Sequence, residues 1–493
     1  MKALLWAVAL VAFTAVGGCD VFIPEAGFFG QKCRSDGRCA KGLICAQGQC
    51  VDREMPILFV RVHEGSIEDG LTWETAYKDP QSAVNAALEG DTIVVAAGRY
   101  RLEESPAASL VEMRAGVDLL GGFSGDEDPS GFDAVQDLRE VRQGTTRSVL
   151  DCEGGCAHVV VGASNALIDG FEMRGGAAGE AVAESGDCGG GLLARGLENL
   201  VIENCQIREN SGVTGGGACI EVANGEITFE NCEIRQNEAI GSGGGLLMRD
   251  CAEKVRIQGC TVSGNSTSGD GGGIACKGSE EVEIIDSSLE SNSASEGGGG
   301  YSYACNYRIE RTFVEQNFAT DNGGGVCYYL SSGYVRSSVF WANGSKVGGG
   351  AYLKDSAVVF VNDIFSLNSA QISGGGLYLV GDSGASTITN SILWLDGNDG
   401  QGGDEIAGDA CLESVRVEDT CIQGGFPAGS RIITDDPMLV NSQAGELALT
   451  AGSNCIDAGQ DGPGIPECDV LGLNRVGVPD LGAYEYGATN ACK

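Results

Sequence analysis

A Gly-Gly-Gly triplet recurs eight times between residues 165 and 400, and this repeat constrains the fold more than any other feature. Between the triplets, an apolar residue followed three positions later by asparagine recurs with the same period of 25–28 residues. Such a period is typical of solenoids, in which each copy buries its apolar face only against the next copy. The triplets begin at Gly189, Gly215, Gly243, Gly271, Gly298, Gly323, Gly348 and Gly374, and the asparagines are Asn210, Asn237, Asn265, Asn292, Asn317, Asn343 and Asn368.

Apolar and polar residues alternate within each copy, as in Ile202-Glu203 and Phe229-Glu230. This alternation predicts short strands with one buried face, and a unit of this length holds about three strands with their turns. The convex helices of a leucine-rich horseshoe are missing, and the unit is too short for a propeller blade. We therefore predict an all-β fold, a right-handed parallel β-helix.

The glycine and asparagine columns have a structural interpretation. Glycine suits a sharp corner at which the backbones of neighbouring coils approach closely. Asparagine tolerates left-handed turn geometry, and stacked side-chain amides can form a hydrogen-bonded ladder along the axis. A phosphate-binding glycine loop would need a strand-to-helix context, which the repeat lacks. Both columns are therefore expected to be structural turns.

Charge excludes several classes of partner. The chain has 31 Lys and Arg against 69 Asp and Glu, a net charge of −38, which repels nucleic acid but is compatible with calcium. The two histidines, His63 and His158, make a His-rich zinc site or a His-based triad unexpected. No cofactor is expected to be required, and Ca²⁺ is a possible ligand.

The N-terminus predicts export. Residues 1–18 have the positive charge, apolar run and small-residue exit of a secretory signal peptide. The sequence Val16-Gly17-Gly18-Cys19 resembles the lipobox of bacterial lipoproteins, in which the cysteine is lipidated. An ordinary signal peptide cut near an incidental cysteine is the alternative. We expect a lipid-anchored protein of the bacterial cell envelope, at the outer membrane or cell surface.

The cysteine count supports an oxidising compartment. Of 21 cysteines, Cys19 is assigned to lipid, and the even remainder allows ten disulfides. Residues 19–53 form a Cys-rich module too small for a core, for which we favour Cys33–Cys45 with Cys39–Cys50 among three connectivities; a zinc site is the alternative. Cys411–Cys421 and Cys455–Cys468 are expected as local bridges, whereas the column of Cys205, Cys232 and Cys260 has no evident pairing.

The remaining chain divides into three parts. Residues 57–160 are expected to form an N-terminal cap and the first coils, residues 161–400 the repeats, and residues 401–493 the closing coils and C-terminal cap. A single capping helix is predicted within the first part. Asp79 and Pro80 suit its start and Gly90 its C-cap.

Over residues 57–487 the sequence resembles the polymorphic outer-membrane protein family, whose repeats read FxxN and GGA-[ILV]. Here the second motif is GGG, and phenylalanine occupies the first motif only at Phe340 and Phe365. The resemblance implies a pectin-lyase-like β-helix. Better-known members carry a C-terminal barrel for autotransport, whereas this chain ends in GATNACK, so we expect the lipid anchor to replace that export route.

No catalytic residue emerges from the motifs. Hydrolase-like Gly-His-Gly and epimerase-like Asp-Pro-His-Asp are absent. Arg256, Glu283 and Arg308 alternate in sign along one outward column, which favours an ion-pair ladder over a catalytic base. The carboxylates at Asp396, Asp399, Asp404 and Glu405 are candidate calcium ligands, with solvated surface charge as the alternative.

Two pairs of aromatic residues are candidate ligand-binding residues. Trp341 and Trp394 occupy an outward column two coils apart, and Tyr352 and Tyr378 another column one coil apart. Aromatic faces at this spacing could stack on sugar rings, unless the segment 396–436 covers them. The favoured function is a non-enzymatic envelope lipoprotein whose β-helix is an adhesive rod that binds glycan or protein. The alternative is a calcium-assisted polysaccharide lyase or another carbohydrate-active enzyme of this fold.

Overall fold

The computed structural model describes residues 43–46, 49–52, 57–62, 68–102, 107–127, 138–139, 142, 147–179, 187–398 and 405–492. The chain divides into two units, Met1–Met55 and Pro56–Lys493. In the first unit, β1 (Leu43–Ala46) and β2 (Gln49–Asp52) pair antiparallel, with Cys45 opposite Cys50. The predicted lipidation of Cys19 and the bridges to Cys33 and Cys39 lie outside the described residues.

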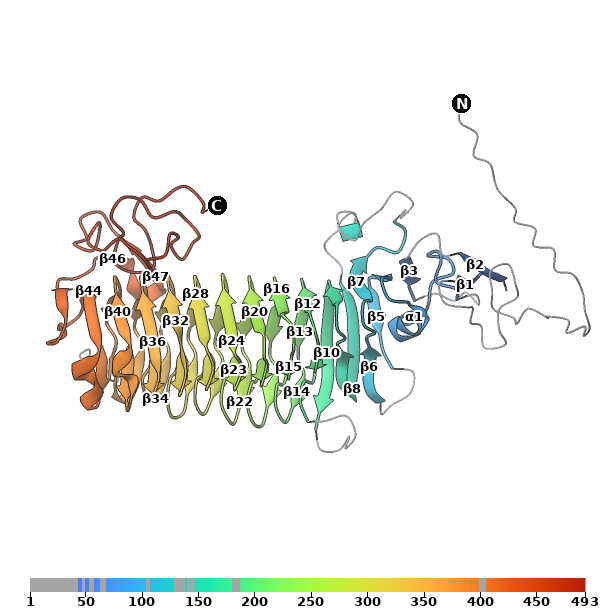
Figure 1. The fold of residues 1–493 in the computed structure, drawn as a ribbon, viewed down its shortest axis with the longest axis horizontal. Helices are drawn as coiled ribbons and strands as arrows, with labels where there is room; N and C mark the ends of the chain where they lie inside the picture. The colour runs from blue at the N-terminus through green and yellow to red at the C-terminus, as the bar shows by residue number, and fades with distance from the viewer. Residues whose placement is uncertain are drawn as a thin grey trace, which may run out of the picture. The chain divides into compact units, whose positions relative to one another are not determined.

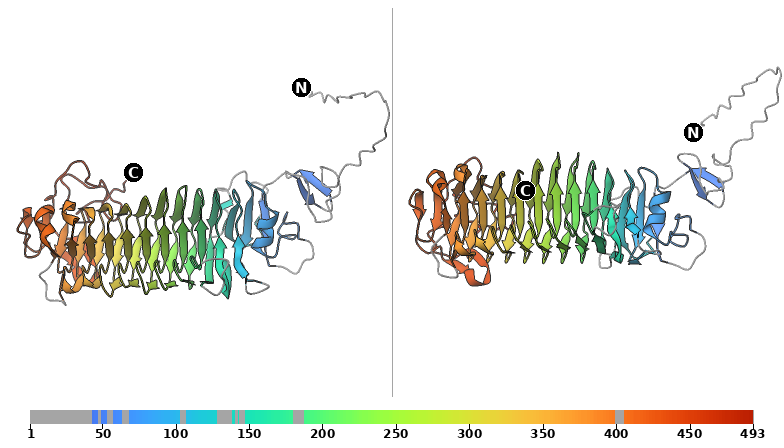
Figure 2. Two further views of the ribbon diagram at one scale, coloured as in Figure 1. Left: turned by 60° about the horizontal axis from the view of Figure 1, so that its bottom comes forward. Right: turned by 90° about the horizontal axis from the view of Figure 1, so that it is seen from below.

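The second unit is the predicted parallel β-helix (Figures 1 and 2). In the repeat region each coil contributes four strands, and each strand pairs in parallel with its counterpart in the next coil, as β12 does with β16 and β15 with β19. The strands thus form four rows along the axis, named A to D here.

Row A consists of β9 (Ala166–Asp169), β12 (Leu200–Glu203), β16 (Ile227–Glu230), β20 (Lys254–Gln258), β24 (Glu281–Ile285), β28 (Tyr307–Glu310), β32 (Ser332–Arg336), β36 (Ala357–Val361), β40 (Thr387–Thr389) and β44 (Arg416–Ile422). Row B consists of β10 (Phe171–Ala178), β13 (Gln206–Arg208), β17 (Glu233–Arg235), β21 (Thr261–Ser263), β25 (Ser288–Glu290), β29 (Phe313–Glu315), β33 (Val339–Trp341), β37 (Ile364–Ser366) and β41 (Ile392–Trp394).

Row C consists of β14 (Ser211–Gly212), β18 (Glu238–Ala239), β22 (Ser266–Thr267), β26 (Ser293–Ala294), β30 (Phe318–Ala319), β34 (Gly344–Val347), β38 (Ser369–Ser373) and β42 (Gly397–Asn398). Row D consists of β11 (Leu192–Arg195), β15 (Ala218–Glu221), β19 (Leu246–Arg249), β23 (Ile274–Lys277), β27 (Gly300–Tyr303), β31 (Val326–Tyr329), β35 (Ala351–Lys354), β39 (Leu377–Val380) and β43 (Ile406–Gly408).

The first coils and the closing region are less regular. The first coils comprise β3 (Ile57–Val60), β4 (Thr92–Ala96), β5 (Gly98–Tyr100), β6 (Ala107–Glu112), β7 (Asp118–Phe123) and β8 (Ser148–Val161). The closing region comprises β45 (Ser430–Ile433), β46 (Leu439–Asn441) and β47 (Glu446–Leu449), and the short 3-10 helices are η1 (Ser383–Ala385), η2 (Ala410–Ser414) and η3 (Ser442–Ala444).

The capping helix α1 (Pro80–Ala86) starts as predicted and ends earlier. The Asp79 carboxylate accepts from the Ser82 amide at 2.8 Å, and Pro80 is the first helical residue. The helix stops at Ala86 because the Asp91 carboxylate accepts from the Leu88 amide, which turns the chain into β4. Gly90 is therefore not the C-cap, although its φ of +90° places it in a turn.

An asparagine ladder runs along the junction of rows B and C. Each side-chain amide donates to the side-chain oxygen of the ladder residue in the next coil at 2.9–3.1 Å. The same nitrogen donates to a backbone carbonyl, as from Asn292 to Val262 at 2.9 Å. The expected left-handed conformation falls one residue earlier, at Glu209 or Ser291. The asparagines are thus selected for the ladder and not for αL geometry.

The glycine triplets lie at sharp corners where neighbouring backbones approach closely, as predicted, but one triplet begins at a different residue. The first glycine is left-handed, as at Gly271 with φ of +71°. At the second and third glycines of a triplet, a Cβ would collide with the backbone. A Cβ on Gly273, for example, would lie 2.5 Å from the Gly299 carbonyl oxygen. In the run of four glycines the left-handed residue is Gly297 (φ +64°), so the triplet begins there and not at Gly298. Gly300 is a strand residue, where a Cβ would lie 2.8 Å from the Tyr307 hydroxyl.

The column of Cys205, Cys232 and Cys260 is another axial ladder. The Cys232 amide donates to the Cys260 sulfur at 3.4 Å, and the Cys260 amide donates to the Ser287 hydroxyl at 3.1 Å. All three thiols are buried and free. The expectation of ten disulfides is therefore wrong, because these cysteines act as small hydrogen-bonding residues in the position that serine and threonine fill in later coils.

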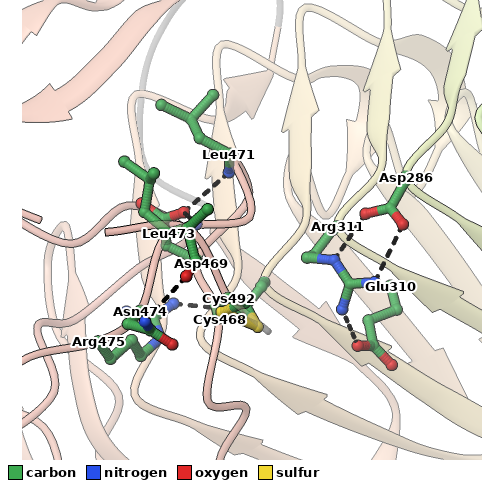
Figure 3. Close-up of a disulfide and its surroundings, with 12 residues drawn as sticks. Asp286, Glu310, Arg311, Cys468, Asp469, Leu471, Leu473, Asn474, Arg475 and Cys492 are labelled. Atoms are coloured by element: carbon green, nitrogen blue, oxygen red, sulfur yellow. Dashed lines mark hydrogen bonds and ion pairs between the residues drawn. A yellow bond between two sulfur atoms is a disulfide. The ribbon is translucent and has the colours of Figure 1, made fainter. Parts of the chain in front are cut away.

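Four disulfides lie among the described side chains: Cys152–Cys156, Cys188–Cys219, Cys276–Cys305 and Cys468–Cys492. The predicted Cys455–Cys468 bridge is wrong, because the partner of Cys468 is Cys492 (Figure 3). The predicted Cys411–Cys421 bridge is also absent, since both thiols are free.

The structure brings Cys421 against Cys455 instead, in one buried cluster where their thiols are in hydrogen-bond contact. We expect refolding with oxidised glutathione to join these sulfurs, as two thiols lose two protons and two electrons to the glutathione disulfide. Non-reducing peptide mapping should then recover the Cys421–Cys455 pair, while Cys327 stays free as an internal control. Alkylation of both Cys421 and Cys455 after this treatment would contradict the prediction.

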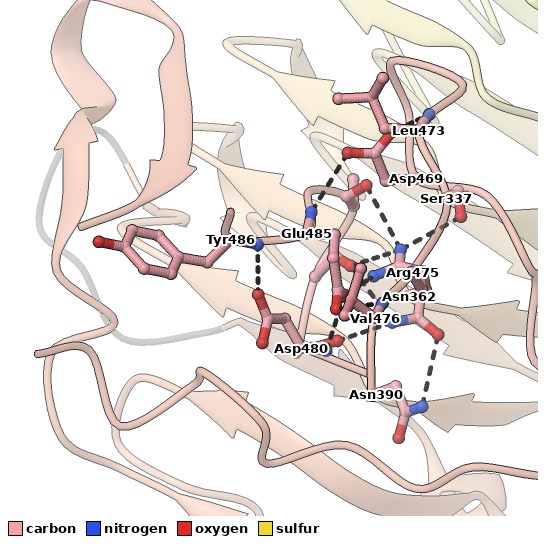
Figure 4. A network of polar contacts seen from close by, with 12 residues as sticks. Ser337, Asn362, Asn390, Asp469, Leu473, Arg475, Val476, Asp480, Glu485 and Tyr486 are labelled. Carbon is pink, nitrogen blue, oxygen red and sulfur yellow. Dashed lines mark hydrogen bonds and ion pairs between the residues drawn. The ribbon is translucent and has the colours of Figure 1, made fainter. Parts of the chain in front are cut away.

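The C-terminal segment folds back over the outward face of row B (Figure 1). Leu447, Leu449 and Leu481 form one cluster with Val339 and Ile364. A polar network reinforces this contact (Figure 4). Its centre is the Arg475 guanidinium, which contacts the Glu485 carboxylate at 3.2 Å and the Ser337 hydroxyl at 3.3 Å. Among the described residues, no helix is long and apolar enough to span a bilayer.

Candidate functional site

The tryptophans predicted to bind ligand are covered by this C-terminal segment. The Trp341 indole donates to the Ser442 carbonyl at 3.0 Å, and Gly445 lies against its ring. Trp394 packs against the same cluster. Both tryptophans are therefore half-buried, and their role in ligand binding stays a prediction. Residues 442–445 contact Trp341, whereas Trp394 packs against a cluster that includes Cys421 of the segment 396–436.

Tyr352 and Tyr378 are neighbours, as the spacing predicts, but they belong to a stack. Their rings lie 5.8 Å apart and nearly parallel, and Tyr329 continues the series at 5.8 Å from Tyr352. Tyr352 is 9% exposed, and burial raises its pKa to about 12. The faces of these rings contact one another, so the stack mainly stabilises the outward side of row D.

The last residues of four consecutive row D strands form an exposed edge, here called the row D edge. It consists of Lys277, Tyr303, Tyr329 and Lys354, which are register partners in successive coils. Tyr303 is 44% exposed. In the preceding coils this column reads Arg195, Glu221 and Arg249, and Val380 follows Lys354, so tyrosines after a run of charged residues were the signal in the sequence.

A groove of about 510 Å³ runs along the corner that directly follows this edge. Its lining comes from successive coils at 278–280, 304–306, 330–332 and 355–357, with Asp382 at one end. Buried Ser279 and Ser331 lie on it together with exposed Leu330 and the carboxyl groups of Glu280 and Asp355. The groove is thus parallel to the axis and acidic, and Tyr303 directly precedes one of its lining segments in the chain.

The outward column of Arg256, Glu283 and Arg308 is an ion-pair network. Glu283 is 6% exposed and contacts Arg256 at 3.2 Å and Lys254 at 3.0 Å. Arg308 contacts Glu283 at 3.4 Å and Glu281 at 3.0 Å. Arg256 and Arg308 are therefore each held by carboxylates of neighbouring coils, which is the expected ladder.

Two of the four candidate calcium ligands are described. Asp396 is fully buried and Glu405 is 3% exposed, so neither is solvated surface charge. Burial raises the pKa of both carboxyl groups, and the neighbouring charge of Asp396 raises the pKa of Glu405 further. Asp399 and Asp404 lie outside the described residues. The described group of Cys188, Cys219 and Glu221 could approach a metal, but its two sulfurs are joined in a disulfide.

This chain is similar to known proteins both in part of its sequence and in its structure. Residues 148–303 match the model of a family described as "Right handed beta helix region". No curated protein matches the sequence. Among solved structures the chain is similar to pectate lyase Pel9A, with 14% identity over 87% of this chain and 96% of that chain and a TM-score of 0.47.

Two further solved structures are similar. XylC in complex with xylose has 12% identity over 88% of this chain and 99% of that chain, with a TM-score of 0.39. The tailspike protein gp49 of Acinetobacter baumannii bacteriophage Fri1, a capsular polysaccharide depolymerase, has 12% identity over 82% of this chain and 70% of that chain, with a TM-score of 0.38. The parallel β-helix itself is shown by the strand pairings of this chain, and the matching family model describes the right-handed form.

Proposed function

We propose that this protein is a cell-envelope lipoprotein, anchored through Cys19, whose β-helix binds an extended glycan without cleaving it. The supporting observation is the corner groove, which continues across successive coils; the exposed Tyr303 directly precedes one of its lining segments in the chain. A groove parallel to the axis suits a linear polymer, because every coil offers it a similar set of groups at one repeat distance.

The chemistry of the groove narrows the class of glycan. The exposed Ser332 hydroxyl and the carboxylates can exchange hydrogen bonds with sugar hydroxyls, and a tyrosine ring offers an apolar face with a polar tip. Glu280, Asp355 and Asp382 add negative charge to an acidic protein, which disfavours a polyanionic chain. We therefore expect a neutral or amino-sugar-containing glycan.

The groups that line the groove support the non-enzymatic assignment. Its described lining contains acids, serines, an asparagine and apolar residues, and no Lys, Arg or His. A calcium-assisted lyase, the alternative, needs a basic residue beside its calcium-binding carboxylates. The nearby row A cations are engaged in ion pairs instead.

Substituting Tyr303→Ala should weaken glycan retention about tenfold, or about 1.4 kcal/mol, since an exposed aromatic anchor is removed. A glycan array of the full chain, run with and without calcium, identifies the ligand, and titration of the best hit gives the affinity. Phe318→Ala is the matched control, because Phe318 is an aromatic residue of similar exposure on row C, away from the groove.

Three outcomes would contradict the proposal. Equal glycan retention by the wild type and the Tyr303 variant would show that this part of the surface does not bind the glycan. Appearance of shortened or unsaturated products would establish the lyase alternative. Capture of peptides but of no glycan would indicate a protein-binding rod.

A further inference from the structure

The asparagine ladder places a hydrogen-bond donor at the same point of every coil. Beside the third glycine of a triplet stands the side-chain nitrogen, where a Cβ on Gly273 would lie 3.0 Å from Asn292 Nδ2. This nitrogen donates to the carbonyl three residues before the preceding ladder residue, as Asn368 does to Phe340 at 2.9 Å. The side-chain nitrogen thus satisfies the hydrogen-bonding capacity of a carbonyl that points toward the interior.

Asp396 reverses this arrangement at the end of the ladder. Its Oδ1 accepts from the Asn368 amide nitrogens at 2.7 and 2.9 Å, as an asparagine oxygen would. Its Oδ2 takes the place of the missing donor, because a Cβ on Gly376 would lie 2.8 Å from it. By the same register, Oδ2 is directed toward the Phe365 carbonyl. An acceptor therefore faces an acceptor in a fully buried position.

Glu405 brings a second carboxylate to the same place. It starts the return of the chain into β43, where its carbonyl accepts from the Leu377 amide at 2.8 Å. Both side-chain oxygens of Glu405, like Asp396 Oδ2, are buried and have no hydrogen-bond donor. The two carboxyl groups thus contact each other, and no other described side chain donates to Asp396 Oδ2 or to the Glu405 oxygens.

We propose that Asp396 and Glu405 bind a divalent cation, Ca²⁺, which closes the asparagine ladder. Calcium prefers six to eight oxygen ligands, including carboxylates and backbone carbonyls, and tolerates irregular geometry. Asp396 Oδ2, a bidentate Glu405 and the Phe365 carbonyl supply four, and water completes the sphere. A double positive charge offsets the two buried negative charges, which neither a hydroxyl nor an amide could do. This site is structural and independent of the proposed glycan groove.

Calcium binding to the full chain tests the site. We expect equilibrium dialysis at pH 7.5 and 150 mM NaCl to show one tightly bound calcium per chain, and calcium to raise the Tm by about 3 °C or more relative to chelator. Asp396→Asn should lose both effects and yet fold, because it supplies the donor that the ladder places in seven other coils. Glu405→Gln should also lose the bound calcium.

Glu290→Gln controls for calcium attracted by the acidic surface, since Glu290 and Glu315 form an acidic pair elsewhere on the rod. This control should retain the tight site and the Tm shift. The proposal is overturned if wild type binds no tight calcium, or if the Asp396 and Glu405 variants keep it. A chain that binds no calcium but is stabilised by Asp396→Asn would show that the two carboxyls share a proton.

Discussion

Gly273→Ala should lower the unfolding free energy by about 3 kcal/mol, enough to cause partial misfolding of the rod. The added Cβ would lie 2.5 Å from the Gly299 carbonyl of the next coil and 3.0 Å from Asn292 Nδ2. Neither neighbour can yield, because the Gly299 peptide lies in the stacked backbone and Asn292 is held by the ladder. The two coils must therefore move apart, which weakens the hydrogen bonds between them.

Thermal and urea unfolding followed by circular dichroism measures this effect. Gly179→Ala is the control, since nothing lies within 4 Å of a Cβ there and no left-handed φ is involved. That substitution should change stability by no more than about 0.5 kcal/mol. A Gly273 variant as stable as this control would show that the coils can separate by a few tenths of an ångström at little cost.

Asn292→Ala should destabilise the protein by about 3 kcal/mol. Its side-chain nitrogen donates to the Val262 carbonyl and to Asn317, and its oxygen accepts from the Asn265 backbone amide at 3.0 Å. Alanine leaves these groups buried without partners, and it also leaves a small cavity. The ladder is cut at its middle, so the effect should spread to both neighbouring coils.

The control for this variant is the adjacent residue. Ser291 is exposed with φ of +54°, so Ser291→Gly should be neutral or slightly stabilising. The Tm of both variants, and hydrogen exchange of the Asn265 and Asn317 backbone amides, report the difference. Unchanged exchange in the Asn292 variant would mean that water replaces the side chain without loss.

Much of the fold was predictable because it repeats. Because the same pattern occurs eight times, the position of the buried residue within each copy is clear even where one copy deviates. Ile207, Phe340 and their equivalents were therefore correctly predicted to be buried. The start of α1 was predictable because Asp79 and Pro80 are local signals. Which glycine of the run 297–300 begins the triplet was not predictable, because four consecutive glycines allow the triplet to start at Gly297 or at Gly298. In the structure Gly297 is left-handed, and Gly300 is a strand residue beside Tyr307.

The candidate site was less predictable. Trp341 looked exposed because the residues that cover it lie about 100 positions later in the chain. Tyr303 escaped notice because its value depends on a groove that forms only when several coils stack. The cysteine column was misjudged by counting, although its replacement by Ser287 and Thr312 indicated a hydrogen-bonding role.

The sequence by itself determined the period, the buried face and the residues at each corner, because these depend on neighbours along the chain and on one repeated unit. The tertiary structure alone decided which surfaces remain open. In the folded chain the C-terminal segment covers Trp341, whereas Tyr303, which precedes a lining segment of the groove, stays exposed. The tertiary structure also buried Asp396 against Glu405, at the point where the next coil no longer supplies an asparagine. These outcomes depend on contacts between distant or irregular segments, for which a repeat provides no pattern.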